Sequence, residues 1–106
     1  MNRELTKDIF EDAVMRSDVP VLVDFYAGWC RWCRVMEPNV DKLADEVEAA
    51  GSARVFKANI DVLPEIAEKM SVKTVPTLIV FRNGQETARK TGTKTFRAMR
   101  KMLLGE

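Results

Sequence analysis

Short hydrophobic runs alternate with longer amphipathic segments along this chain. After Thr6, a candidate N-cap, apolar residues recur at three- and four-residue spacing and predict a helix over about residues 7–16. Residues 19–26 are β-branched, aromatic and almost free of polar side chains, which is typical of a strand buried on both faces. A sheet with helices on both sides is therefore expected.

The next segment predicts a long helix with a kink. Helix-forming residues run from Cys30 to about Ala50, and Gly51 is suited to end the helix. Pro38 lies inside this segment. Because proline removes one backbone hydrogen bond and clashes with the preceding turn, we expect the largest bend about one turn before Pro38.

The second half of the chain predicts a strand, a short helix, a hairpin and a last helix. Pro64 is suited to the first position of a helix of about seven residues. Asn83-Gly84 is a strong signal for a tight turn between antiparallel strands. The expected strands cover residues 54–60, 77–81 and 87–91, and the last helix covers residues 95–104.

This order of elements predicts an α/β fold with a central mixed sheet flanked by helices on both faces. The sheet has four strands, or five if residues near Leu5 add a very short edge strand. A second core in a chain of 106 residues would leave each half too small to be stable. We therefore expect a single domain over residues 1–106.

Composition and charge exclude several classes of function. The chain has 17 basic and 16 acidic residues, and its densest basic group, Arg97, Arg100 and Lys101, is typical of a solvated helix face. We expect no binding to nucleic acid. No apolar stretch is long enough for a membrane span, and no apolar segment follows the first residues, so we expect a cytoplasmic protein that binds no membrane.

The chain contains two cysteines and no histidine. A structural zinc site needs about four Cys or His ligands, and the common Cys-His and Ser-His-Asp nucleophiles need an imidazole. One chain supplies neither, and we expect no metal and no cofactor.

Cys30 and Cys33 lie where the buried strand passes into the long helix. Their spacing places both sulfurs at the helix N-terminus, within reach of a disulfide. Free backbone N–H groups and the helix dipole lower the pKa of the first thiol there, and the thiolate is the form that attacks a disulfide. The alternative is two incidental buried cysteines.

Several segments in the correct order resemble the thioredoxin family. They are VLVDFYAGWC at residues 21–30, NID at 59–61, VPT at 75–77, FRNG at 81–84, and Gly92 before the last helix. The resemblance implies the thioredoxin fold and a protein-disulfide oxidoreductase that acts as a monomer on protein disulfides.

The resemblance implies that Cys30 is the exposed nucleophile and Cys33 the buried resolving thiol, which releases the reduced substrate. The position of Cys30 at the start of the helix, with Cys33 one turn inside, favours the same assignment.

Asp24 interrupts an otherwise apolar strand. Burial would raise the pKa of its carboxyl, so that it can carry a proton near neutral pH. The family uses this position to deprotonate the resolving thiol, whereas the alternative is a side chain that faces water. Lys57 matches a family lysine near this carboxylate, or it is an ordinary surface residue of a strand.

The resemblance also predicts the surface that meets the substrate. The family holds the proline at Pro76 in the cis form beside the cysteines, which leaves the backbone of Val75, in the segment that continues to Thr77, free to pair with an extended substrate. Trp29 is expected to be a partly exposed aromatic beside the sulfurs, with packing as its alternative role.

Arg31 and Trp32 depart from the Gly-Pro pair of typical thioredoxins. A cation at Arg31, supported by Arg34, should stabilise the Cys30 thiolate and the reduced form. We therefore expect a potential less negative than about −270 mV, in the range of about −200 to −230 mV. The resemblance implies a thioredoxin reductase as redox partner. Trp32 is also similar to the aromatic of glutaredoxin active sites, which makes glutathione the alternative partner.

Two other functions fit parts of this pattern. Without a proline after the first thiol, two chains could bridge an iron-sulfur cluster through Cys30 and Cys33. Alternatively, a redox-idle module could hold a peptide on the surface around Trp29, Trp32 and Pro76. The presence of both cysteines and Asp24 argues against the second alternative.

Overall fold

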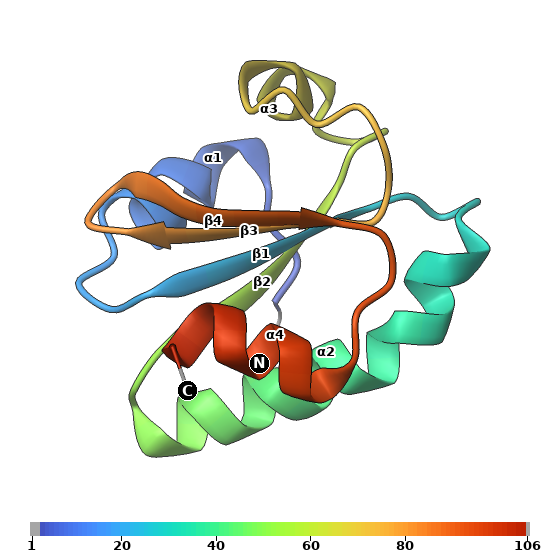
Figure 1. Ribbon diagram of the computed structural model, residues 1–106. Helices are drawn as coiled ribbons and strands as arrows, with labels where there is room; N and C mark the ends of the chain where they lie inside the picture. The colour runs from blue at the N-terminus through green and yellow to red at the C-terminus, as the bar shows by residue number, and fades with distance from the viewer. Residues whose placement is uncertain (1–2, 106) are drawn as a thin grey trace.

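The computed structural model describes residues 3–105 and contains a four-stranded mixed sheet between two layers of helices (Figure 1). The strands lie in the order β2-β1-β3-β4, with β1 parallel to β2 and β3 antiparallel to both β1 and β4. The predicted α/β class is confirmed. Residues 1, 2 and 106 of the predicted domain lie outside the described residues.

The elements follow one another in the predicted order. Their bounds are α1 Lys7–Phe10, η1 Glu11–Met15, β1 Val21–Tyr26, α2 Arg31–Ala50, β2 Arg54–Asn59, α3 Pro64–Lys69, β3 Thr77–Arg82, β4 Gln85–Thr91 and α4 Phe96–Leu104. The first predicted helix is divided, because η1 is a π-helical turn. The N–H of Arg16 donates to the carbonyl of Glu11, five residues earlier, at 3.0 Å.

Helix α2 begins directly after Cys30, which is its N-cap, and ends at Gly51 in a left-handed C-cap. Pro38 lies inside the helix. In Figure 1 the cyan first turns of α2 run at an angle to its green remainder, as expected for a proline in a helix. The start of α2 lies beside the carboxyl end of β1, because only residues 27–30 connect the two elements.

Alternating residues of the strands fill two cores, one on each face of the sheet. Val21, Val23 and Phe25 of β1 pack on the side of α1 and α3. Leu22 belongs to the other core, which packs against α2 and α4. The alternation places Asp24 on this second face, beneath α2.

A tight turn joins β3 to β4, and a single bridge extends the sheet beyond β2. Asn83 and Gly84 have φ angles of 53° and 76°, as a tight turn between β3 and β4 requires. At the other edge, the expected fifth strand is a single parallel bridge between Glu4 and Lys57. The N–H of Leu5 donates to the carbonyl of Lys57 at 2.8 Å.

Within residues 3–105, no helix is both long and apolar enough to cross a membrane.

Candidate active site

Cys30 and Cys33 form a disulfide at the junction of β1 and α2, with their Cα atoms 5.3 Å apart. The backbone N–H of Cys33 donates to Sγ of Cys30 at 3.2 Å. This N–H belongs to the first turn of α2, where backbone donors lack partners within the helix. Negative charge on Cys30 is therefore stabilised when the disulfide opens.

The expected contrast between an exposed Cys30 and a buried Cys33 is absent from this disulfide form. Cys30 is 6% exposed and Cys33 is 4% exposed. Both pack in a small cluster with Ala27, against which Tyr26, Ile60 and Val75 also lie. The neighbouring segments cover both sulfurs, so exposure does not distinguish the two cysteines.

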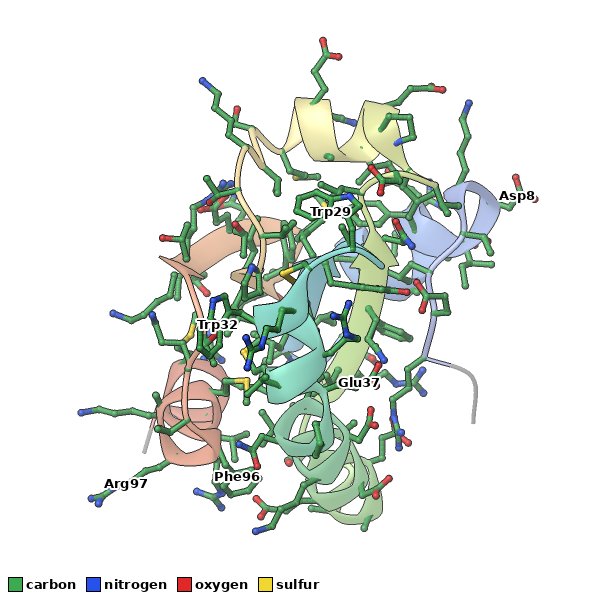
Figure 2. All side chains as sticks on the ribbon, turned by 90° about the vertical axis from the view of Figure 1, so that its right-hand side faces the viewer. Asp8, Trp29, Trp32, Glu37, Phe96 and Arg97 are labelled. Carbon is green, nitrogen blue, oxygen red and sulfur yellow. A yellow bond between two sulfur atoms is a disulfide. The ribbon has the colours of Figure 1, made fainter. Side chains whose placement is uncertain are left out.

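Trp29 and Trp32 are both exposed beside the disulfide, as Figure 2 shows. The indole Nε1 of Trp29 donates to Asp61 Oδ2 at 3.0 Å, which fixes the ring toward the start of α3. The guanidinium of Arg31 lies 5.7 Å from the centroid of the Trp32 ring. Arg34 donates to the carbonyl of Gly28 at 2.8 Å.

Asp24 is buried beneath α2 with 1% of its surface exposed. Its Oδ1 makes no hydrogen bond to any described residue. Burial raises the pKa of Asp24 to about 7, because the charge of Lys57, which acts in the opposite direction, compensates only part of the lost hydration. A pocket of about 220 Å³ beside α2 is lined by both Asp24 and Cys33.

Lys57 is the partner of Asp24 in the register between β1 and β2. Its ammonium forms an ion pair with Glu37 of α2 and lies 5.5 Å from the centroid of the Tyr26 ring. Burial lowers the pKa of Lys57, but the hydrogen bond to Glu37 and the negative charges of Glu37, Asp41 and Asp24 together outweigh that effect, and the pKa is raised overall. Lys57 therefore carries a positive charge at neutral pH.

The Val75-Pro76 peptide bond is cis, and Val75 packs against the cysteine pair. The side chains of Pro76 and Thr77 are buried, and Thr77 Oγ1 donates to the carbonyl of Thr74 at 2.7 Å. The carbonyl of Pro76 accepts from the N–H of Gly92 at 2.9 Å. Of the three residues in this segment, only Val75 is partly exposed.

A model of the family described as Thioredoxin matches residues 2–104 of the chain. This chain belongs to the thioredoxin family. It is 39% identical over 92 residues to a thioredoxin of Rickettsia bellii, covering 87% of this chain and 86% of the relative. It is 42% identical over 83 residues to thioredoxin 1 of a Nostoc species, covering 78% of this chain and 76% of the relative. A thioredoxin of Porphyra purpurea is 42% identical over 82 residues, or 77% of this chain and 75% of the relative.

Membership makes the chain a thioredoxin-type thiol/disulfide oxidoreductase with a Cys-X-X-Cys pair. No cluster of three or more His, Cys, Asp or Glu that could hold a metal ion is found among residues 3–105. The structure places the sequence-predicted Cys33, Asp24 and Lys57 around one pocket, and Cys30 is joined to Cys33 by the disulfide.

Sequence reasoning missed three polar residues around Asp24 of this thioredoxin-family chain. They are Glu37, which pairs with Lys57, Tyr26 and Glu4; the hydroxyl of Tyr26 donates to Glu4 Oε1 at 2.6 Å. Glu37 follows Cys33 by four residues, so the two share a helix face. Tyr26 follows Asp24 by two, so the two share a face of the sheet. These spacings could have identified Glu37 and Tyr26 from the sequence, whereas the position of Glu4 near Tyr26 depends on the tertiary fold.

Proposed function

We propose that this chain exchanges dithiol and disulfide with protein substrates, with Cys30 as nucleophile and Cys33 as resolving thiol. The single observation that carries the assignment is the hydrogen bond from the Cys33 N–H to Sγ of Cys30. It stabilises a thiolate on Cys30 and has no counterpart on Cys33 among the hydrogen bonds of the described chain.

In the proposed reaction the reduced protein supplies two electrons. The Cys30 thiolate attacks one sulfur of the substrate disulfide and releases the other as a thiolate, which takes a proton from solvent. The Cys33 thiol then loses its proton and attacks Sγ of Cys30. The mixed disulfide breaks, the enzyme disulfide forms, and the substrate leaves with both sulfurs reduced.

Asp24 is the proposed carrier of the Cys33 proton. Both side chains line the same pocket, and the pKa of about 7 allows the carboxyl to bind or release a proton near neutral pH. In the reverse direction, protonated Asp24 would return that proton when a donor thiol opens the disulfide. Lys57 tunes this step through its charge.

Trp29 and the backbone of Val75 are the proposed contacts with the substrate. Neither the N–H nor the carbonyl of Val75 is bonded to another described residue, and both belong to a segment packed against the cysteines. An extended peptide can therefore pair with this backbone. Pro76 and Thr77 support the segment from within.

The redox potential proposed for the pair is less negative than about −270 mV, in the range of about −200 to −230 mV. The support is the charge of Arg31 and Arg34 on the first turn of α2, where a cation favours the thiolate. Replacing Arg31-Trp32 by Gly-Pro should make the potential more negative. A wild-type potential at or below about −270 mV in a glutathione buffer would show that the charge argument is wrong.

Reduction of insulin disulfides with dithiothreitol tests the activity itself. Wild-type protein should accelerate the reduction, and Cys30→Ser should not, because the attacking sulfur is lost. Equal acceleration by both proteins would contradict the proposed nucleophile. The reductant, whether a thioredoxin reductase or glutathione, and the cytoplasmic location stay predictions from the sequence.

A further inference from the structure

Three charged residues lie side by side on neighbouring segments of the sheet: Glu4 on the N-terminal segment, Lys57 on β2 and Asp24 on β1. We call them the charged row. Glu4 is bridged to Lys57, and Lys57 is in register with Asp24. Residues opposite one another in a sheet present their side chains to the same face. This row therefore faces α2, the helix that begins at the redox pair.

The Lys57 ammonium pairs with Glu37 of α2. The two form an ion pair in which the Lys57 side chain is 15% exposed and that of Glu37 is 49% exposed. In Figure 2, Glu37 projects from α2 toward the side of β2, away from Trp32. Glu37 also lines the pocket that contains Asp24 and Cys33, so the ion pair lies at the outer rim of that pocket.

We propose that Glu37 is a positioning residue that holds the Lys57 ammonium at this rim and thereby sets the pH range in which Asp24 exchanges a proton with Cys33. The proposal rests on the proposed role of Asp24 as proton carrier. It adds a residue that touches neither sulfur.

Two effects of Glu37 act in the same direction on Asp24. Its carboxylate disfavours a second negative charge nearby, and its ion pair with Lys57 offsets part of the stabilisation that this cation gives to ionised Asp24. Both favour the protonated carboxyl. Loss of Glu37 should therefore make Asp24 ionise at lower pH.

Other charged and titratable groups besides Glu37 also surround Asp24. Glu4 on the N-terminal segment and Asp41 on α2 disfavour its ionisation, whereas Lys57 on β2 favours it. Tyr26 on β1 has its pKa raised by burial and by its hydrogen bond to Glu4, and it stays neutral at physiological pH. Arg34 on α2 also lines the same pocket.

The test is Glu37→Gln, in which the side chain keeps its shape and loses its charge. The Asp24 carboxyl is titrated by carbon-detected NMR, and the acid limb of insulin reduction is measured over the same pH range. Both midpoints should move to lower pH by about one unit. An unchanged or higher midpoint in the NMR titration would overturn the proposal.

Glu46→Gln is the matched control. Glu46 is also on α2 and also pairs with a cation, Arg100 on α4. Loss of this charge should leave both midpoints unchanged, and an equal shift would show that any charge on α2 has the same effect.

Asp24→Asn separates this inference from the proposed function. If Asp24→Asn leaves the acid limb of the wild-type profile in place, the proton-carrier role fails and the inference fails with it. If Asp24→Asn removes that limb but Glu37→Gln leaves it unmoved, the inference alone fails.

Discussion

Asp24 carries a carboxyl group buried in β1, a strand whose other buried residues are all apolar. It is 1% exposed, and its Oδ1 has no hydrogen-bond partner among the described residues. Burying an ionised carboxylate under such conditions costs free energy. The cost falls on the folded state, and it appears only at pH values where Asp24 is ionised.

The pH dependence of stability follows from the two pKa values of this carboxyl. The ordinary value is 3.8, and the folded value is raised to about 7. Between these values the folded state binds more protons than the unfolded state, so the free energy of unfolding falls as pH rises. The destabilisation is absent below about pH 4 and complete above about pH 7.

Asp24→Asn should remove this loss of stability. At one pKa unit per 1.4 kcal/mol, the variant should gain up to about 4 kcal/mol over wild type at pH 8 and little at pH 4. Urea unfolding of both oxidised proteins at the two pH values measures the difference. Asp8→Asn, at an exposed position of α1, is the control and should show no such gain at pH 8. If the free energies of unfolding of Asp24→Asn and wild type differed by the same amount at both pH values, ionisation of buried Asp24 would not be the cause of the difference.

At the scale of elements, the hairpin between β3 and β4 is fixed by one close approach. The Cβ of any residue in place of Gly84 would lie 2.9 Å from the backbone carbonyl oxygen of Met15 in η1. The φ angle of Gly84 is also positive, at 76°. Because Gly84 has no side chain, the turn can pack directly against the backbone of η1 at Met15.

Gly84→Ala should destabilise the protein by about 1–3 kcal/mol, because strain from the positive φ adds to the clash. The matched control is Gly51→Ala, at a φ of 67° with no atom within 4 Å of the added Cβ. Thermal unfolding should show a larger loss for Gly84→Ala than for Gly51→Ala. Equal losses would mean that the contact with Met15 does not contribute.

The sequence predicts these elements well where hydrophobic periodicity or a turn signal is strong. Asn83-Gly84 gives the hairpin, and Gly51 gives the end of α2. The π-helical turn after α1 was not predicted, because its apolar spacing also fits an α-helix. The expected fifth strand near Leu5 is a single bridge between Glu4 and Lys57.

At the scale of the whole molecule, the fold brings three distant segments to one end of the sheet. They are the junction of β1 and α2, the start of α3 with Asp61, and the loop with Val75. The resemblance to the thioredoxin family predicts their meeting from the sequence. It does not predict that Glu37 pairs with Lys57, because that contact depends on how α2 crosses β2.

The exposure of the two cysteines also depends on the whole fold. Helix position alone predicts an accessible Cys30, but Ile60 and Val75 arrive from other parts of the chain and cover the pair. The hydrogen bond at Sγ of Cys30 thus distinguishes the two thiols better than their burial does.

The most direct test of the account is a covalent trap of the mixed disulfide. Cys33→Ser and Cys30→Ser proteins are each reduced, mixed with a disulfide-linked peptide and analysed by mass spectrometry after acid quenching. Cys33→Ser should accumulate an adduct of one peptide half on Cys30, because no resolving thiol can release it, and Cys30→Ser should form little or none. An adduct that forms equally fast on Cys33 in Cys30→Ser would contradict the assignment of Cys30 as nucleophile.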